Sequence, residues 1–317
     1  MPAPHRLFAV VIPVFNEEAV LPELFRRLNA VFDGQPDASW LAILVDDGSR
    51  DNSVELIRAQ GTRDPRWCLV ELSRNFGFQA ALAAGLADAA DRKVDAAITM
   101  DADLQDPPEL IPELVGAWAK GAEVVRAVRR TRSETGLRRV GLDLFHRLYG
   151  NLIDYRVEPN TGTFCLLGRS AIEAFNQLPE RNRFFPGLRA WIGFPTADIL
   201  YDRKERAAGE PQQTFGRLVR YAMDGIYSFS YLPLRILTYI GLIVSAFGFA
   251  LGTFFVVRRV LGIEIAQTGF TTLVTLVLFL GGVQLIGIGV LGEYLARVYD
   301  EVKRRPNYVV KRPVRRD

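Results

Sequence analysis

Histidine and cysteine are scarce in this chain, which has only two of each among its 317 residues. His5 and His146 are too far apart in sequence to suggest a metal site, and we expect His5 at the terminal surface. Cys68 and Cys165 both lie in apolar surroundings, so we predict reduced core thiols in a reducing compartment. Neither the G-x-G-x-x-G fingerprint nor a P-loop occurs, so dinucleotide redox chemistry and ATP hydrolysis have no support.

Charge is absent from two long stretches, residues 236–257 and residues 268–292. Because about 20 apolar residues span a bilayer as a helix, we predict two transmembrane helices here. Two buried core helices are the alternative. The chain after the second stretch is strongly basic, whereas the link between the stretches carries only Arg258, Arg259 and Glu264. The positive-inside rule therefore places both termini in the cytoplasm.

These features divide the chain into four predicted regions. Residues 1–215 form a cytoplasmic domain, and the aromatic-rich residues 216–235 form a juxtamembrane interfacial segment. Residues 236–292 hold the two spans, and residues 293–317 form a basic cytoplasmic tail. Residues Met1 to Arg6 lead straight into a predicted strand, so we expect no secretory signal.

Apolar runs and helical patterns alternate through the first domain. The predicted strands are Phe8–Pro13, Leu41–Val45, Cys68–Leu72 and Ala96–Met100. The helix after the first strand has apolar residues at helical spacing, namely Leu21, Leu24, Phe25, Leu28 and Val31. Such alternation predicts an α/β fold, Rossmann-like, with a mostly parallel sheet and flanking helices.

A polar cluster follows each predicted strand: Pro13–Glu17, Asp46–Ser49, Arg74–Gly77 and Asp101–Gln105. Ligands bind at the carboxyl ends of the strands in such sheets, so we expect these clusters to converge on one edge. Asp101 and Asp103 can direct two carboxylates at one cation, as Mg²⁺ or Mn²⁺ prefers. For that motif alone, a solvated strand-to-helix turn is the alternative.

Four stretches carry a resemblance to a known family: Val10–Glu18, Val45–Ser53, Leu72–Leu82 and Met100–Pro108. Together they resemble the GT-A glycosyltransferases, and within them the dolichol-phosphate mannose synthase branch. Leu291–Pro306 is similar to the bacterial polyprenyl-phosphate glycosyltransferases, the bactoprenol glucosyltransferase-like group. The resemblance covers nearly the whole chain. It implies a GT-A fold followed by a C-terminal two-helix transmembrane hairpin.

The resemblance also implies roles for individual residues. Asp101, Asp103 and Arg129 are the expected catalytic residues, and Asp101, Asp103 and Gln105 would surround the Mg²⁺ or Mn²⁺ ion. The nucleotide-sugar would be bound by Pro13, Phe15, Glu17, Asp46, Arg74, Asp101, Arg129, Arg138 and Arg206. Most arginines between Arg126 and Arg139 belong to a predicted basic surface. Apolar residues from Leu137 to Leu148 share that segment, as in an amphipathic helix lying on an anionic membrane.

Two positions depart from the family pattern. Thr163 stands where the family often has Asp, and Gln212 stands where it usually has Lys. The first change puts a dedicated general base in doubt, although an acceptor phosphate is already ionised. The second removes a positive charge. Both departures are compatible with an unusual donor sugar, a shifted phosphate site or weakened activity.

The resemblance implies an inverting transfer of a sugar from a UDP-sugar to undecaprenyl (polyprenyl) phosphate. The product would be a lipid-phosphate-sugar for cell-envelope glycans. Glucose is the default, and other sugars stay open. We expect a multi-pass protein of the bacterial inner membrane, with no nucleic-acid partner, and a homo-oligomer, for which relatives suggest a tetramer. The alternatives are a polysaccharide synthase, disfavoured by the lack of a polymer channel, and a catalytically altered membrane scaffold or sugar-lipid binding protein.

Overall fold

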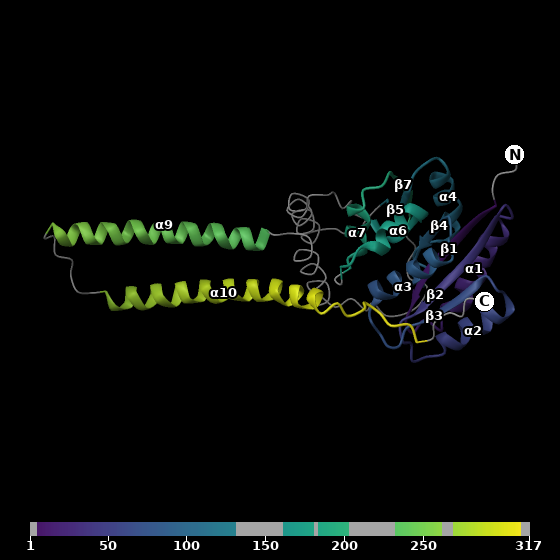
Figure 1. The fold of residues 1–317 in the computed structure, drawn as a ribbon, viewed down its shortest axis with the longest axis horizontal. Coiled ribbons are helices and arrows are strands. Elements are labelled where there is room, and N and C mark those ends of the chain that lie inside the picture. Colours follow the sequence, from purple (N-terminus) through teal and green to yellow (C-terminus); the bar gives the residue numbers. More distant parts are fainter. Residues whose placement is uncertain (1–4, 131–160, 181–182, 203–231, 262–268, 312–317) are drawn as a thin grey trace. The chain divides into compact units, whose positions relative to one another are not determined.

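The computed structural model describes residues 5–130, 161–180, 183–202, 232–261 and 269–311 (Figure 1). The chain forms two compact units, which are considered separately. One comprises Met1–Phe215 together with Pro306–Asp317, and the other comprises Gly216–Arg305. The last residues of the chain thus group with the N-terminal unit, although the sequence presents them only as a basic tail. The predicted roles of the four regions stay predictions.

The first unit is built on a seven-stranded sheet in the order β3-β2-β1-β4-β6-β5-β7. Its strands are β1 (Arg6–Val14), β2 (Ala38–Asp46), β3 (Trp67–Glu71), β4 (Ala96–Thr99), β5 (Val124–Arg129), β6 (Thr161–Gly168) and β7 (Thr196–Tyr201). The first four strands are parallel, and β5 pairs in parallel with β7. Strand β6 runs antiparallel to both of its neighbours. The predicted α/β fold with a mostly parallel sheet is confirmed.

Helices cover this sheet. They are α1 (Leu21–Asp33), α2 (Ser53–Arg63), α3 (Phe78–Asp91), α4 (Ile111–Ala119), α6 (Arg169–Gln177) and α7 (Phe185–Trp191), and a short 3-10 turn at Pro108–Leu110 precedes α4. Helix α1 buries the residues that its spacing predicts, because these positions recur on one face of a 3.6-residue helix.

Helix α3 approaches the sheet unusually closely at Gly85. A Cβ atom at that position would lie 2.3 Å from Cγ1 of Val11 and 2.9 Å from Cγ2 of Val45. Both valines are fully buried in the central strands β1 and β2. The missing side chain therefore sets the distance between this alanine-rich helix and the sheet.

The two cysteines are free thiols, as predicted. Cys165 is buried in β6, whereas Cys68 in β3 is only partly buried. Burial raises the pKa of the Cys68 thiol, so the reactive thiolate is disfavoured at neutral pH. His5 is exposed, in agreement with its predicted surface position, and its ring hydrogen-bonds to Ser39 Oγ at 2.8 Å.

The second unit contains two long helices, α9 (Leu232–Val260) and α10 (Phe270–Val302). Within α10, Phe279–Val302 is long and apolar enough to cross a membrane, and only 6% of its apolar window is buried. The matching apolar stretch of α9, Ile236–Leu251, is shorter. Among the described residues, one helix is thus both long enough and apolar enough to cross a membrane. The span predicted over residues 236–257 and the two-span topology stay predictions.

Candidate active site

Four loops leave the sheet at the carboxyl ends of β1, β2, β3 and β4. Each contains one residue with a left-handed backbone: Asn16 (φ 56°), Gly48 (φ 77°), Gly77 (φ 96°) and Leu104 (φ 59°). Glycine and asparagine adopt this conformation readily, but a leucine does so at an energetic cost. Such strain is typical of loops whose shape serves a site. The sequence alone does not indicate that Asn16 and Leu104 adopt this backbone conformation.

The first two loops are joined to each other by hydrogen bonds. The Asn16 amide donates to Ser49 Oγ at 3.0 Å, and the Glu17 amide donates to Ser53 Oγ at 2.9 Å. In return, the Arg50 amide donates to Asn16 Oδ1 at 2.8 Å. These contacts fix the backbone that directly follows Phe15, and Phe15 itself is 36% exposed.

Two neighbouring carboxylates shape the second and third loops. Asp46 accepts hydrogen bonds from the amides of Gly48 and Ser49, both at 3.1 Å. Asp47 accepts from the amides of Phe76 at 2.7 Å and Gly77 at 2.9 Å. Burial raises the pKa of Asp47, against the opposing effect of these two amides. Asp47 is therefore a positioning residue, which the sequence indicated only as a member of the cluster Asp46–Ser49.

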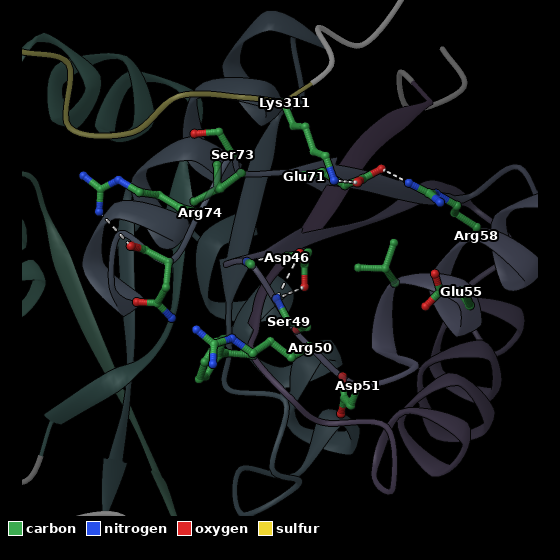
Figure 2. A pocket seen from close by; sticks show the side chains of 15 residues that line it. Asp46, Ser49, Arg50, Asp51, Glu55, Arg58, Glu71, Ser73, Arg74 and Lys311 are labelled. Atoms are coloured by element: carbon green, nitrogen blue, oxygen red, sulfur yellow. Dashed lines mark hydrogen bonds and ion pairs between the residues drawn. The ribbon is translucent and has the colours of Figure 1, made fainter.

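A pocket of about 580 Å³ opens between these loops (Figure 2). Its size lies in the range of small-molecule sites. The predicted nucleotide-binding residues Phe15, Asp46 and Arg74 line it. The guanidinium of Arg74 lies 4.0 Å from the centre of the Phe76 ring and donates to the Asn75 carbonyl at 3.0 Å. The stacked guanidinium is thereby held at the pocket wall.

Two further predicted residues, Pro13 and Glu17, do not line this pocket. Pro13 is buried within β1, opposite Val45 of β2, and Glu17 is held by its amide at the start of the following turn. Arg138, Arg206 and Gln212, and the predicted amphipathic helix with His146, lie outside the described residues.

The predicted metal-binding residues occupy a separate cluster beyond β4. Asp101 Oδ1 accepts a hydrogen bond from Thr163 Oγ1 at 2.9 Å. Asp103 is buried, with 7% of its surface exposed, and its Oδ1 accepts from the Gln105 amide at 3.1 Å. Within the described ranges, no three His, Cys, Asp or Glu side chains are grouped so that they could hold a metal ion. The predicted metal site consists of two carboxylates and the side-chain amide of Gln105, so a group of three such side chains is not required for it. The predicted metal site is therefore not tested by this finding and stays a prediction.

Arg129 is positioned next to this cluster by a chain of hydrogen bonds. Its Nε donates to the Tyr201 hydroxyl at 3.2 Å, and that hydroxyl donates to Asp106 Oδ1. Burial, and then the charge of Asp106, raise the pKa of Tyr201, so the phenol stays protonated. A Cβ atom on Gly162 would lie 3.0 Å from Arg129 Nη2, which places the guanidinium against the residue that precedes Thr163. Neither Tyr201 nor Asp106 was predicted to belong to the site.

The profile of the glycosyl transferase family 2 matches residues 9–175, more than half of the chain. The chain belongs to glycosyl transferase family 2. The matched region contains the four parallel strands and their loops, and the predicted GT-A type of fold is confirmed.

The transferase has relatives that match it over nearly its whole length. It is 42% identical to an uncharacterized glycosyltransferase of Synechocystis sp., over 95% of this chain and 94% of that one. It is 40% identical to a prophage bactoprenol glucosyl transferase homolog of Escherichia coli (strain K12), over 96% and 98%. It is also 40% identical to the bactoprenol glucosyl transferase of Shigella phage SfII, over 96% and 97%.

Proposed function

We propose that this transferase moves a hexose from a UDP-sugar to undecaprenyl phosphate, with glucose as the first donor to test. The observation that carries this proposal is the 40% identity to bactoprenol glucosyl transferases over nearly the full chain. Similarity of that extent includes the strand-end loops and the helices that follow the sheet domain.

The pocket supports the donor half of the proposal. The partly exposed ring of Phe15 offers a face on which a nucleobase can stack. Asp46 offers a carboxylate for base or ribose, and the guanidinium of Arg74 lies on the opposite loop. The cluster of Asp101, Asp103 and Arg129 at the neighbouring strand ends would then receive the diphosphate and the sugar.

The transfer is a single displacement. An oxygen of the acceptor phosphate bonds to the anomeric carbon, while the bond from that carbon to the diphosphate oxygen breaks. The nucleoside diphosphate leaves with the electron pair, and the anomeric configuration inverts. The acceptor phosphate is already ionised at neutral pH, so no base has to remove a proton. Thr163 in place of an acid is compatible with this reaction, since positioning and charge stabilisation are what the site must supply.

Asp101, Asp103 and Gln105 have the oxygen donors that suit Mg²⁺ or Mn²⁺, and we propose that they hold such an ion. A bound divalent cation neutralises charge that develops on the diphosphate. The protein's own contribution is to hold Asp103 in place through the Gln105 amide and Asp101 through Thr163. Arg129 supplies a fixed positive charge near the same loops.

We further propose that the transferase is a multi-pass protein of the bacterial inner membrane, with the sheet domain on the cytoplasmic side and assembly as a homo-oligomer. The apolar window in α10 supports membrane association. The basic residues after that helix support the orientation. Delivery of the acceptor lipid would then take place at the cytoplasmic surface.

A donor screen tests the proposal. Purified full-length protein in detergent receives undecaprenyl phosphate, Mg²⁺ or Mn²⁺, and one UDP-sugar at a time, and mass spectrometry detects the lipid product. We expect product with one sugar, no product with EDTA, and at least a hundredfold loss for Asp103→Asn, of the order seen when a charged catalytic contact is removed. Asp37→Asn, an exposed position outside the site, is the matched control.

The alternative of a catalytically altered scaffold predicts a different result. Product from no donor, together with an unchanged cellular role for Asp103→Asn, would contradict the transfer reaction. A metal-independent product would contradict the role of the three proposed metal-binding residues while leaving the transfer itself in place.

A further inference from the structure

The last described residues of the chain return to the sheet and pair with its edge strand. Val310 forms an antiparallel bridge with Leu72, directly after β3. The Ser73 amide donates to the Val309 carbonyl at 2.8 Å, and the Lys311 amide donates to the Glu71 carbonyl at 2.7 Å. Because β3 is the outermost strand, this pairing satisfies backbone groups that an edge strand leaves open.

The segment is also anchored on the N-terminal side of this bridge. Asn307 Nδ2 donates to the Glu180 carbonyl at 3.3 Å. The neighbouring Tyr308 is partly buried, and burial raises the pKa of its phenol. Residues 307–311 therefore form a docked strand with its own contacts. We call them the docking strand.

The docking strand delivers Lys311 to the pocket already described. Figure 2 shows its side chain extending to Glu71, which lies between Lys311 and Arg58. Lys311 Nζ is 3.8 Å from Glu71 Oε2, and Arg58 forms an ion pair with Glu71 Oε1. The Glu71 side chain is only 11% exposed, whereas that of Lys311 is 62% exposed. The lysine thus adds charge at the pocket rim with little burial of its own.

The charges that line the pocket balance only if this lysine is included. Four carboxylates, those of Asp46, Asp51, Glu55 and Glu71, face four cations, those of Arg50, Arg58, Arg74 and Lys311. Without Lys311 the lining is net negative and repels an anionic ligand. The same strand also fixes Ser73, the residue before Arg74, through its backbone.

We propose that the docking strand is a wall of the donor pocket and that Lys311 is a positioning residue for the nucleotide. Lys311 neutralises Glu71, and the backbone of the docking strand fixes the loop that begins at Ser73. Together these two effects raise the affinity of the pocket for a nucleoside diphosphate. This inference rests on the proposed function, because it assigns the donor to this pocket. It concerns donor binding alone, so loss of Lys311 raises KM for the donor and leaves kcat nearly unchanged.

Calorimetric titration of the full-length protein in detergent with UDP and Mg²⁺ tests the inference. We compare the wild type with Lys311→Ala, Lys311→Glu and Lys311→Arg. Lys120→Ala is the matched control, since Lys120 is an exposed lysine of the same unit away from the pocket. We expect Lys311→Ala to weaken UDP binding about fivefold, from the loss of one partly screened charge. Lys311→Glu should weaken it further, whereas Lys311→Arg and the control should match the wild type.

Salt and heat separate an electrostatic role from a structural one. The difference between the wild type and Lys311→Ala should shrink at high ionic strength, because exposed charges are screened. The melting temperatures of all variants should agree. Equal UDP affinity for the wild type and Lys311→Ala would overturn this inference and leave the proposed function intact. Failure of the wild type to bind UDP or any other nucleoside diphosphate would overturn both.

Discussion

Thr163 Oγ1 donates a hydrogen bond to Asp101 Oδ1 across 2.9 Å, which joins the beginning of strand β6 to the loop after β4. The backbone carbonyl of Thr163 in turn accepts from the hydroxyl of Thr99, which is buried. A carboxylic acid at position 163 would instead place two like charges beside each other and raise the pKa of one of them. The threonine thus stabilises Asp101 as an oriented carboxylate.

Replacing Thr163 by valine keeps the shape of the side chain and removes the donor. A hydrogen bond to a charged group contributes about 1.5–3 kcal/mol, so we expect kcat for lipid-sugar formation to fall at least tenfold. Thr163→Ser keeps the hydroxyl and should retain most of the activity. Steady-state kinetics with the identified donor measure both. Equal rates for the valine and serine variants would contradict a role for this bond.

Tyr201→Phe tests the chain that positions Arg129. The variant keeps the ring, and with it the edge contact to Phe164, but removes the acceptor of Arg129 and a donor to Asp106. We expect kcat to fall about tenfold, and the melting temperature to drop because a donor to a buried carboxylate, worth about 1–3 kcal/mol, is lost. Tyr299→Phe on α10, an exposed position, is the control and should change neither. A stable variant with wild-type kcat would show that Arg129 needs no such support.

Gly85→Ala tests the close packing of α3 on the sheet. The added methyl group would meet Val11 at 2.3 Å, inside a fully packed core. We expect a loss of about 1–3 kcal/mol in the free energy of unfolding, visible as a lower melting temperature in detergent. Gly116→Ala in α4 is the matched control, because no atom lies within 4 Å of the added group. That variant should melt at the same or a higher temperature, as alanine favours a helix over glycine by about 1 kcal/mol.

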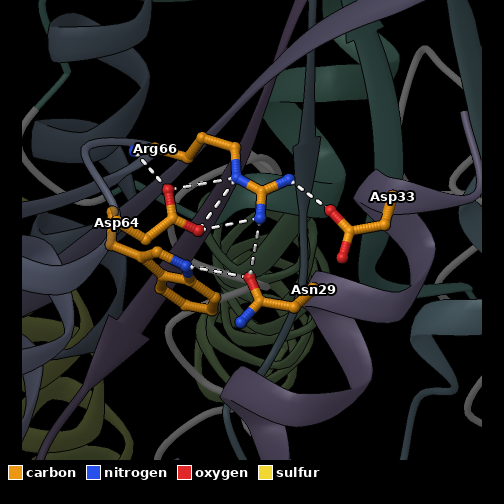
Figure 3. A network of polar contacts seen from close by, with 5 residues as sticks. Asn29, Asp33, Asp64 and Arg66 are labelled. Carbon is orange, nitrogen blue, oxygen red and sulfur yellow. Dashed lines mark hydrogen bonds and ion pairs between the residues drawn. The ribbon is translucent and has the colours of Figure 1, made fainter. Parts of the chain in front are cut away.

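A network around Arg66 connects α1 to the start of β3 (Figure 3). The guanidinium contacts Asp64 at 2.8 Å and Asp33 at 2.8 Å, and it reaches Asn29 Oδ1 at 3.4 Å. Trp67 Nε1 donates to the same Asn29 oxygen at 3.1 Å. The hydrogen bond from Arg66, against the opposing effect of burial, lowers the pKa of Asp64 below its ordinary value of 3.8.

Because of this network, the free energy of unfolding should depend on pH in the acidic range. The pKa of Asp64 is lower in the folded protein than in the unfolded chain. Its contribution to the free energy of unfolding is therefore fully present above the ordinary pKa of 3.8 and disappears as the pH falls through the pKa of the folded state. Arg66→Met should lower the unfolding free energy by about 1 kcal/mol at pH 7, as for partly exposed ion pairs. The difference in melting temperature should shrink below the ordinary pKa. The Arg66 guanidinium also lies 5.5 Å from the centre of the Phe32 ring, and a pH-independent difference would assign the effect to this packing alone.

Much of the fold could be predicted from local patterns. Alternating strands and helices indicated the parallel half of the sheet, since each pattern lies within a short stretch of chain. The strand-end clusters placed Phe15, Asp46 and Arg74 at one pocket, because parallel neighbouring strands end at the same edge. Asp101 and Asp103 could be placed on the loop after β4 because they directly follow that strand in the sequence.

The sequence by itself thus determined the α/β class, the strand-end loops and the family, all of which depend on short-range order. Tertiary structure alone decided the antiparallel insertion of β6, the chain from Arg129 through Tyr201 to Asp106, and the arrival of Lys311 at the pocket. These pairings join residues far apart in the chain, by strand-edge hydrogen bonds and buried polar contacts. No periodicity marks such contacts in advance, because they depend on which backbone edges and polar groups remain open once the sheet has formed.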